Sequence, residues 1–155
     1  MPLAEVARIG HFRQDTLPGD LQPELAATRH HVPNQTPYYV AHGAQGCHLE
    51  IDTETGQITL LGHWVVDECG RVINPLLVDE QIRGGEVQGI GGALFEHCIY
   101  DDDANLLNGT LADYLVPMAS EMPDIEVAHI ETPTSESELG AKGAGESGTG
   151  AAPGG

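Results

Sequence analysis

Two runs of alternating apolar and polar residues, joined by a turn that contains glycine, constrain the fold of this chain more than any other feature. Residues 47–51 alternate in this way, residues 53–56 carry turn chemistry, and the alternation resumes over residues 58–66. A side-chain period of two places one face of each strand toward a core. Glycine in the connecting segment adopts the left-handed conformation readily. The pattern therefore predicts a β-hairpin whose second strand ends near Asp67.

A helix is expected next, over residues 77–98, after the turn at Asn74 and Pro75. Its apolar side chains recur three and four positions apart, as one stripe of an α-helix requires. The members of this stripe are Val87, Ile90, Leu94 and Cys98.

The other side of this helix combines glycines with two glutamine amides. The residues concerned are Gln81, Gly84, Gly85, Gln88 and Gly92. At 3.6 residues per turn they fall within roughly 100° of one another. Each glycine in a helix interior costs about 1 kcal/mol relative to alanine, so another group should approach this backbone closely. Close packing against a helix or sheet is one explanation and a bound ligand is the other; the two amides favour a ligand.

The remaining segments complete an α+β chain, in which an antiparallel, hairpin-based sheet packs against the long glycine-striped helix. The other expected elements are a helix over residues 3–12, a strand over 24–32, a loop over 33–37, a turn over 100–105, an irregular stretch or short helix over 106–117, and a strand over 125–130. The expected organisation is a lead-in of residues 2–37, a core of residues 38–139 and a glycine-rich loop of residues 140–155.

Charge and cysteine usage exclude several classes of protein. The net charge of −18 argues against binding to nucleic acid or to an anionic membrane surface, because both need basic patches. Three cysteines without a CxxC spacing indicate neither a disulfide scaffold nor a zinc site, and they fit a reducing cytoplasm. The eight histidines show no HxxxH or HxH spacing, so no metal held by side chains is expected. Neither a signal peptide nor a membrane span is expected.

The segment Gly140–Gly150, GAKGAGESGTG, holds five glycines, the only lysine of the chain, Lys142, and one acid, Glu146. Glycines at this density let backbone N–H groups approach a ligand, although a disordered tail has a similar composition. Together with the end of the second hairpin strand and the glutamine face of the helix, this segment could form a polar cofactor crevice. Glu146 is the candidate general base of such a crevice.

Four segments identify a family resemblance. VVDECGRVINP (65–75), DEQIRGGEVQGIGGALFE (79–96), MPDIEVAHIETP (122–133) and GAKGAGESGTGAAP (140–153) resemble the xanthine dehydrogenase/aldehyde oxidase family. The match is to the C-terminal part of the molybdenum-binding large subunit, and it implies a fragment of a larger molybdopterin-binding domain. The combination of Q-x-x-G-G-x-x-Q-G-I-G with K-G-x-G-E is much more specific than either glycine motif alone.

The resemblance implies roles for the matched positions. Glu146 stands where the family has its catalytic carboxylate. The residues that match the cofactor-binding framework are Gln81, Gln88, Gly89, Lys142, Gly143, Gly145, Cys69 and Asn74. In this family the pterin holds the metal, so no protein ligand to it is implied. Glu86 stands where the family tends to have a small apolar residue, and from its helix angle we expect it to face solvent.

The resemblance also implies a reaction and partners. The family oxidises an aldehyde or N-heterocycle carbon with water as the oxygen source and passes the electrons to 2Fe–2S and FAD centres. The implied cofactor is molybdenum-molybdopterin, in its cytosine dinucleotide form. The implied partners are the remaining half of the molybdenum subunit, iron–sulfur and FAD subunits and a small-molecule substrate; a homodimer is also conceivable. The isolated chain is expected to be inactive, and a non-catalytic interaction module that kept the fold is the alternative.

Overall fold

The computed structural model describes residues 1–21, 26–32 and 40–152, which form two compact units, residues 1–32 and 33–155. In the first unit, helix α1 spans Leu3–Phe12, as its apolar spacing predicts, and a 3₁₀ turn, η1, spans Gln14–Thr16. The strand expected over residues 24–32 is wrong for its described part, because residues 26–32 lie in no helix or strand. The loop expected over residues 33–37 lies outside the described residues.

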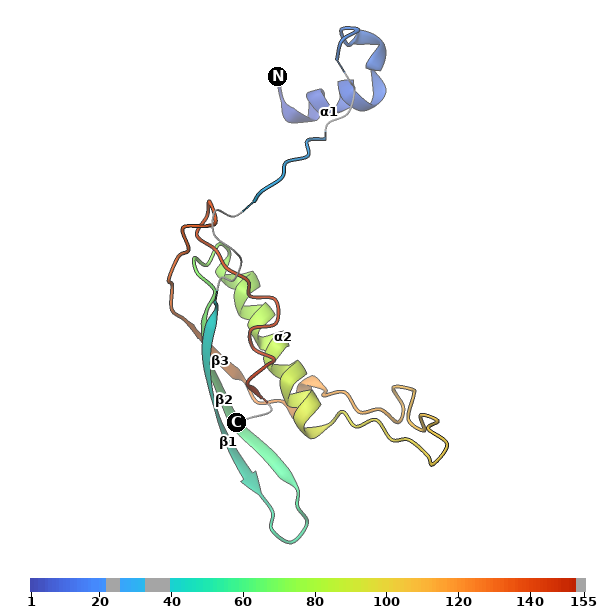
Figure 1. Ribbon diagram of the computed structural model, residues 1–155, viewed down its shortest axis with the longest axis vertical. Helices are drawn as coiled ribbons and strands as arrows, with labels where there is room; N and C mark the ends of the chain where they lie inside the picture. The colour runs from blue at the N-terminus through green and yellow to red at the C-terminus, as the bar shows by residue number, and fades with distance from the viewer. Residues whose placement is uncertain (22–25, 33–39, 153–155) are drawn as a thin grey trace. The chain divides into compact units, whose positions relative to one another are not determined.

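The second unit is built on the predicted hairpin (Figure 1). Strands β1 (His42–Ile51) and β2 (Ile58–Glu68) pair antiparallel, with a bulge between His48 and Leu49. Gly56 in the connecting turn has a φ of 75°, the left-handed conformation expected of it. Strand β1 begins five residues before the alternation does, because the small residues of its first half pair with β2 without an apolar signal of their own.

Strand β3 (Ile125–His129) adds to β2 in parallel, so the sheet has the order β1-β2-β3 and is mixed rather than wholly antiparallel. A parallel neighbour needs a long crossover connection, and helix α2 supplies it here. The α+β class and the hairpin-based sheet are confirmed.

Helix α2 spans Pro75–Leu94, beginning two residues earlier and ending four residues earlier than predicted. Asn74 caps its N-terminus by accepting the N–H of Leu77 at 3.4 Å, and proline fits the first helical position. At its C-terminus the carbonyl of Gly91 accepts the N–H groups of residues 95 and 96, which closes the helix. The predicted stripe member at position 98 is therefore outside the helix and exposed.

Helix α2 covers one face of the sheet, and the apolar core lies between them. The core side chains are Val65, Ile82 and Ile125, with Val78, Val87 and Val127 packed against them. The opposite face of β2 carries Trp64 and Val66, which are 43% and 37% exposed. No helix among the described residues is long and apolar enough to cross a membrane.

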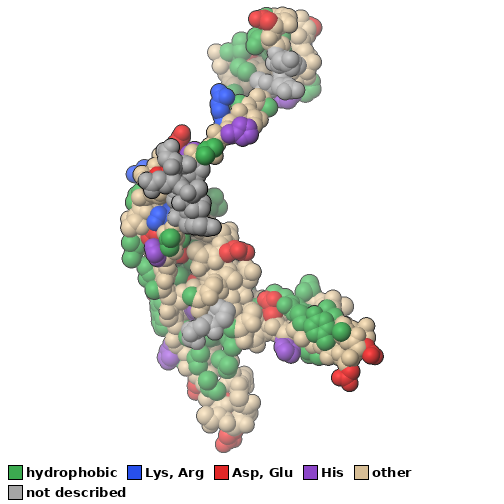
Figure 2. Space-filling view, viewed as in Figure 1, with side chains coloured by type: hydrophobic (Ala, Val, Ile, Leu, Met, Phe, Trp, Pro, Cys, Tyr) green, Lys and Arg blue, Asp and Glu red, His purple; other side chains and the backbone are tan. Residues whose placement is uncertain are grey.

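Between α2 and β3 the chain forms an extended arm, residues 95–118, on which apolar side chains gather (Figure 2). The buried side chain of Asn108 holds two segments of the arm together. It accepts the N–H of Ile99 at 2.9 Å and donates to the carbonyl of His97 at 2.6 Å. The large apolar residues exposed on the arm are Ile99, Tyr100, Leu106, Leu107, Leu111, Leu115, Val116 and Met118. Its turn over residues 100–105 and its irregular remainder agree with the prediction.

Candidate functional site

The glycine-rich terminal segment, residues 140–152, runs along helix α2 (red in Figure 1) and is not a detached tail. The side-chain amide of Gln81 donates to the carbonyl of Gly145 at 2.6 Å. One turn further along the helix, the hydroxyl of Thr149 donates to the carbonyl of Gly85 at 3.1 Å. The segment is therefore held against the helix face that carries Gln81 and Gly85.

Of the three glycines in the stripe, only Gly85 is in contact with the terminal segment; Gly89, beside the stripe, is approached more closely, and Gly91 is approached by Glu96 and Pro117. A Cβ on Gly89 would lie 2.5 Å from Cβ of Ala152, and one on Gly85 would lie 3.4 Å from the backbone nitrogen of Gly148. By contrast, a Cβ on Gly84 or Gly92 would meet nothing within 4 Å among the described residues. The approaching group is thus the chain's own terminal segment, which is the packing explanation for part of the stripe.

Alanine substitutions should separate these two kinds of glycine. Gly89→Ala should lower the free energy of unfolding by about 2 kcal/mol, because the terminal segment must move away from the helix. Gly84→Ala, in open space on the same helix, should raise it by about 0.5–1 kcal/mol through helix propensity alone. Urea denaturation measures both. A loss at Gly84 equal to that at Gly89 would contradict the packing explanation.

The beginning of the terminal segment is hydrogen-bonded to the end of β2. The N–H of Lys142 donates to the carbonyl of Cys69 at 2.7 Å, and Gly70 forms an isolated bridge with Ala141. The Lys142 ammonium lies 2.8 Å from a carboxylate oxygen of Glu68, with both side chains largely buried. This pair anchors the segment to the sheet before the chain reaches Gly143.

Glu68 carries the negative charge of this ion pair. Burial alone would raise the pKa of its carboxyl, but hydrogen bonds from Lys142, Thr132 and Gly70 outweigh that effect and hold the pKa at about 2. The carboxylate is therefore ionised at neutral pH. Burial raises the pKa of the neighbouring Cys69 thiol, so Cys69 stays protonated there. Lys142 thus contacts a carboxylate of its own chain, whereas the sequence indicated a framework position around a cofactor.

The middle of the terminal segment presents free backbone donors. Among the described residues, none accepts the N–H groups of residues 143–146. Gly143, Gly145 and Glu146 are exposed, and so is Gln88, which shares the helix face of Gln81. Consecutive unpaired N–H groups suit an anion or the oxygen-rich edge of a heterocycle, and an exposed carboxylate beside them can exchange a proton with a bound molecule.

The other predicted site residues lie at the edges of this arrangement. Asn74 caps α2, and its amide oxygen is occupied by that cap. Cys69 is 3% exposed, and its carbonyl accepts a hydrogen bond from the terminal segment. Gly89 is buried under that segment. The structure thus brings Gln81, Gly145 and Glu146 together and gives the other three positions contacts within the chain.

Three buried polar residues between the sheet and α2 were not among the predicted site residues. His63 and Asp67 of β2 and Glu86 of α2 are 4%, 2% and 0% exposed. The expectation that Glu86 faces solvent is wrong: its Oε2 lies 2.9 Å from Nε2 of His63. Two periodicities could have identified them: His63 and Asp67 each lie two residues from Val65 and so share its face of the strand, and Glu86 lies four residues from Ile82.

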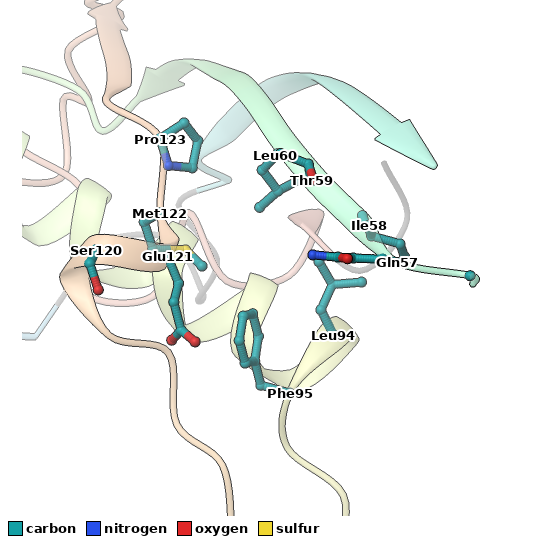
Figure 3. Close-up of a pocket in the computed structure, with 11 residues that line it drawn as sticks. Gln57, Ile58, Thr59, Leu60, Leu94, Phe95, Ser120, Glu121, Met122 and Pro123 are labelled. Atoms are coloured by element: carbon teal, nitrogen blue, oxygen red, sulfur yellow. The ribbon is translucent and has the colours of Figure 1, made fainter. Parts of the chain in front are cut away.

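An open groove of about 600 Å³ lies at the other end of α2 (Figure 3). Its walls come from the first residues of β2, from the C-terminal end of α2 and from the segment before β3; they include Leu60, Phe95 and Met122. Among the described residues on its walls the only ionisable one is Glu121, whose carboxylate accepts the N–H of Met118 at 2.7 Å. The walls are both polar and apolar, and the described residues on them offer no paired acid and base.

Comparison with known proteins assigns the chain to a family. A family model described as molybdopterin cofactor-binding domain matches residues 1–123. The chain belongs to this family. It is 36% identical over 151 residues to the nicotine 6-hydroxylase large subunit of Paenarthrobacter nicotinovorans, covering 97% of this chain and 18% of that protein. It is 35% identical to the xanthine dehydrogenase molybdenum-binding subunit of Escherichia coli O157:H7, covering 68% of this chain and 14% of that protein.

A solved structure is also similar. Quinoline 2-oxidoreductase from Pseudomonas putida 86 superposes with a TM-score of 0.77 at 40% identity, over 99% of this chain and 19% of that one. The resemblance to the molybdenum-binding large subunits of the xanthine dehydrogenase/aldehyde oxidase family is confirmed. The chain spans less than a fifth of the length of these relatives.

Proposed function

We propose that this chain is the C-terminal part of the large subunit of a molybdenum hydroxylase. The enzyme oxidises a carbon atom of an aldehyde or an N-heterocycle, takes the oxygen atom from water and passes two electrons to 2Fe–2S and FAD centres. The observation that carries the proposal is the tether from Gln81 to Gly145, which holds the Glu146 carboxylate beside unpaired backbone donors. Relatives named for nicotine and quinoline favour an N-heterocycle as substrate.

The residues present suit a molybdopterin cofactor, and we propose that it is bound in its cytosine dinucleotide form. The unpaired N–H groups of residues 143–146 and the exposed amide of Gln88 can donate to the oxygen atoms of its pterin and phosphate groups. When bound, the molybdenum centre would supply the two-electron redox chemistry of the proposed reaction.

Glu146 acts as the general base in this proposal. Its carboxylate takes the proton that water releases as its oxygen is transferred to the substrate carbon. The turn closed by the hydrogen bond from the Thr149 N–H to the Glu146 carbonyl, 3.2 Å long, fixes the backbone that carries this carboxylate. The tether from Gln81 fixes the residue before it.

Other polypeptide completes the site. Trp64 and Val66 on the uncovered sheet face and the apolar side chains of the arm, residues 95–118, are areas that a soluble protein normally buries. The remaining half of the large subunit is the proposed cover, and iron–sulfur and FAD subunits dock on the assembled enzyme. A homodimer of the complete enzyme would bury further apolar area.

Molybdenum analysis tests the proposal. The complete large subunit, produced with its partners in a host that makes the cofactor, should contain stoichiometric molybdenum and pterin. The isolated chain from the same host should contain neither, because it provides only part of the pocket. A complete protein without molybdenum would overturn the proposal in favour of a non-catalytic module. Stoichiometric molybdenum in the isolated chain would contradict the shared pocket.

A further inference from the structure

The buried polar residues between the sheet and α2 lie directly beneath the terminal segment. His63 Nε2 and Glu86 Oε2 are 2.9 Å apart, and both side chains are almost fully buried. The second carboxylate oxygen of Glu86 has no hydrogen-bond partner among the described residues. Burying a carboxylate is costly unless it is paired, so a residue with only one partner in this position calls for a role beyond packing.

That second oxygen faces Gly148. A Cβ on Gly148 would lie 3.0 Å from Glu86 Oε1, from the Glu86 backbone nitrogen and from the Ile82 carbonyl oxygen. From the other side, the amide of Gln45 on β1 donates to the Gly148 carbonyl at 2.7 Å. Gly148 is therefore seated between a strand and a helix, and the position of the Glu86 carboxylate determines how closely it approaches α2.

Gly148 lies inside the turn that carries Glu146. The hydrogen bond from the Thr149 N–H to the Glu146 carbonyl closes this turn, and the hydroxyl of Thr149 ties it to Gly85. A displacement of Gly148 must therefore move the backbone of Glu146 relative to the helix. Misplacement of a catalytic group by about 1 Å can cost roughly a hundredfold in rate.

We propose that His63 and Glu86 form a positioning pair: His63 orients the buried carboxylate of Glu86, which seats Gly148 and thereby places Glu146. This inference rests on the proposed role of Glu146 as the base. In this proposal the pair acts only through the backbone of the terminal segment.

The charge state of the pair follows from its surroundings. Burial raises the pKa of the Glu86 carboxyl against the lowering effect of His63. Asp67 on β2 faces it with like charge, whereas Gln45 on β1 and residues 147–149 bring no charge. His129 on β3 acts on Asp67, and on α2 Arg83 is engaged with Glu80 and the Ile125 carbonyl. The pKa of the Glu86 carboxyl is higher in the folded protein than its usual value of 4.5. The contribution of Glu86 to the free energy of unfolding is therefore complete below pH 4.5 and declines as the pH rises through the raised pKa.

Hydrogen exchange of the peptide covering residues 145–152, followed by mass spectrometry of the full protein, tests the inference without relying on turnover. Glu86→Ala should accelerate exchange there by about tenfold to a hundredfold. Glu86→Gln keeps the shape of the side chain but cannot ionise. Once the exchange rate of residues 145–152 is corrected for intrinsic exchange, its remaining dependence on pH should therefore disappear in this variant. Asp79→Asn, which breaks the similar pair between Asp79 of α2 and His129 of β3, should leave this peptide unchanged.

A double variant separates positioning from simple support of the fold. His63→Leu with Glu86→Met replaces both partners by apolar groups, so exchange in the rest of the protein should return to the wild-type rate. Exchange of residues 145–152 should stay fast and turnover low. Full recovery of that peptide would overturn the inference, as would a pH dependence of its exchange that persists unchanged in Glu86→Gln. A wild-type enzyme without molybdenum-dependent turnover would instead remove the proposed function and leave the exchange result standing.

Discussion

Glu146→Gln should reduce the turnover number of the complete enzyme by about a hundredfold to ten-thousandfold, the range expected when a general base is removed. The amide has nearly the shape of the carboxylate but cannot accept the proton. Among the described residues Glu146 is exposed and its side chain makes no hydrogen bond, so the fold should not change. Steady-state kinetics should show a lower kcat with little change in KM, because the lost interaction belongs to the transition state.

Molybdenum content and a second glutamate serve as controls for this result. The variant should retain wild-type molybdenum, since the groups proposed to hold the cofactor are backbone N–H groups and the Gln88 amide. Glu54→Gln changes an exposed glutamate in the hairpin turn and should leave turnover unaffected. Near-normal turnover of Glu146→Gln would refute the assignment of the base. Parallel losses of turnover and molybdenum would mean that Glu146 acts in binding.

Gly70→Ala should lower the free energy of unfolding more than the alanine substitution of Gly56, Gly84 or Gly89. Gly70 has a φ of 74°, a conformation that costs about 1–2 kcal/mol for a residue with a side chain. A Cβ there would also collide with the carbonyl oxygen of Gly140, which accepts the N–H of Arg71. The clash adds about 1–3 kcal/mol, because backbone cannot move aside as a side chain can. We expect a total loss of about 2–5 kcal/mol in the free energy of unfolding.

Gly56→Ala provides the matched control, because Gly56 has nearly the same φ, 75°, but no atom within 4 Å of the added Cβ among the described residues. It should lose only the conformational part, about 1–2 kcal/mol. Urea denaturation of both variants gives the difference between their losses in free energy of unfolding. This difference measures how much the close contact between the end of β2 and the terminal segment contributes to stability. Equal losses at the two glycines would show that this contact contributes nothing to stability.

The local elements were largely predictable because their signals are short-range. The period of two predicted both hairpin strands and their turn, and apolar spacing predicted α1 and most of α2. The errors fall where a local signal was misleading. Residues 26–32 contain only two β-branched residues, Thr28 and Val32, and no strand among the described residues pairs with them. Helix α2 ends early because the carbonyl of Gly91 is taken by two successive N–H groups.

The candidate site was predictable only in part. The glycines and amides of α2 predicted that another group approaches the helix closely. The group that does so is the glycine-rich terminal segment, residues 140–152, which the sequence also marked as a candidate site. Composition could not tell that Gly85 and Gly89 are covered while Gly84 and Gly92 are open, since all four carry the same helical signal. Which face of a helix is covered depends on where the rest of the chain crosses it.

By itself the sequence determined the family, the hairpin, the long helix and the glycine segment with Glu146, because each depends on neighbouring residues or on a motif. Only the tertiary structure decided that Gln45 reaches Gly148 across 103 positions, that Gln81 tethers Gly145 across 64, and that Glu86 is buried against His63. The physical reason is that periodicity can assign a polar side chain to a buried face but does not identify the distant group that it meets there. The environment of the side chain depends on whether folding brings a hydrogen-bond partner to it from a distant part of the chain.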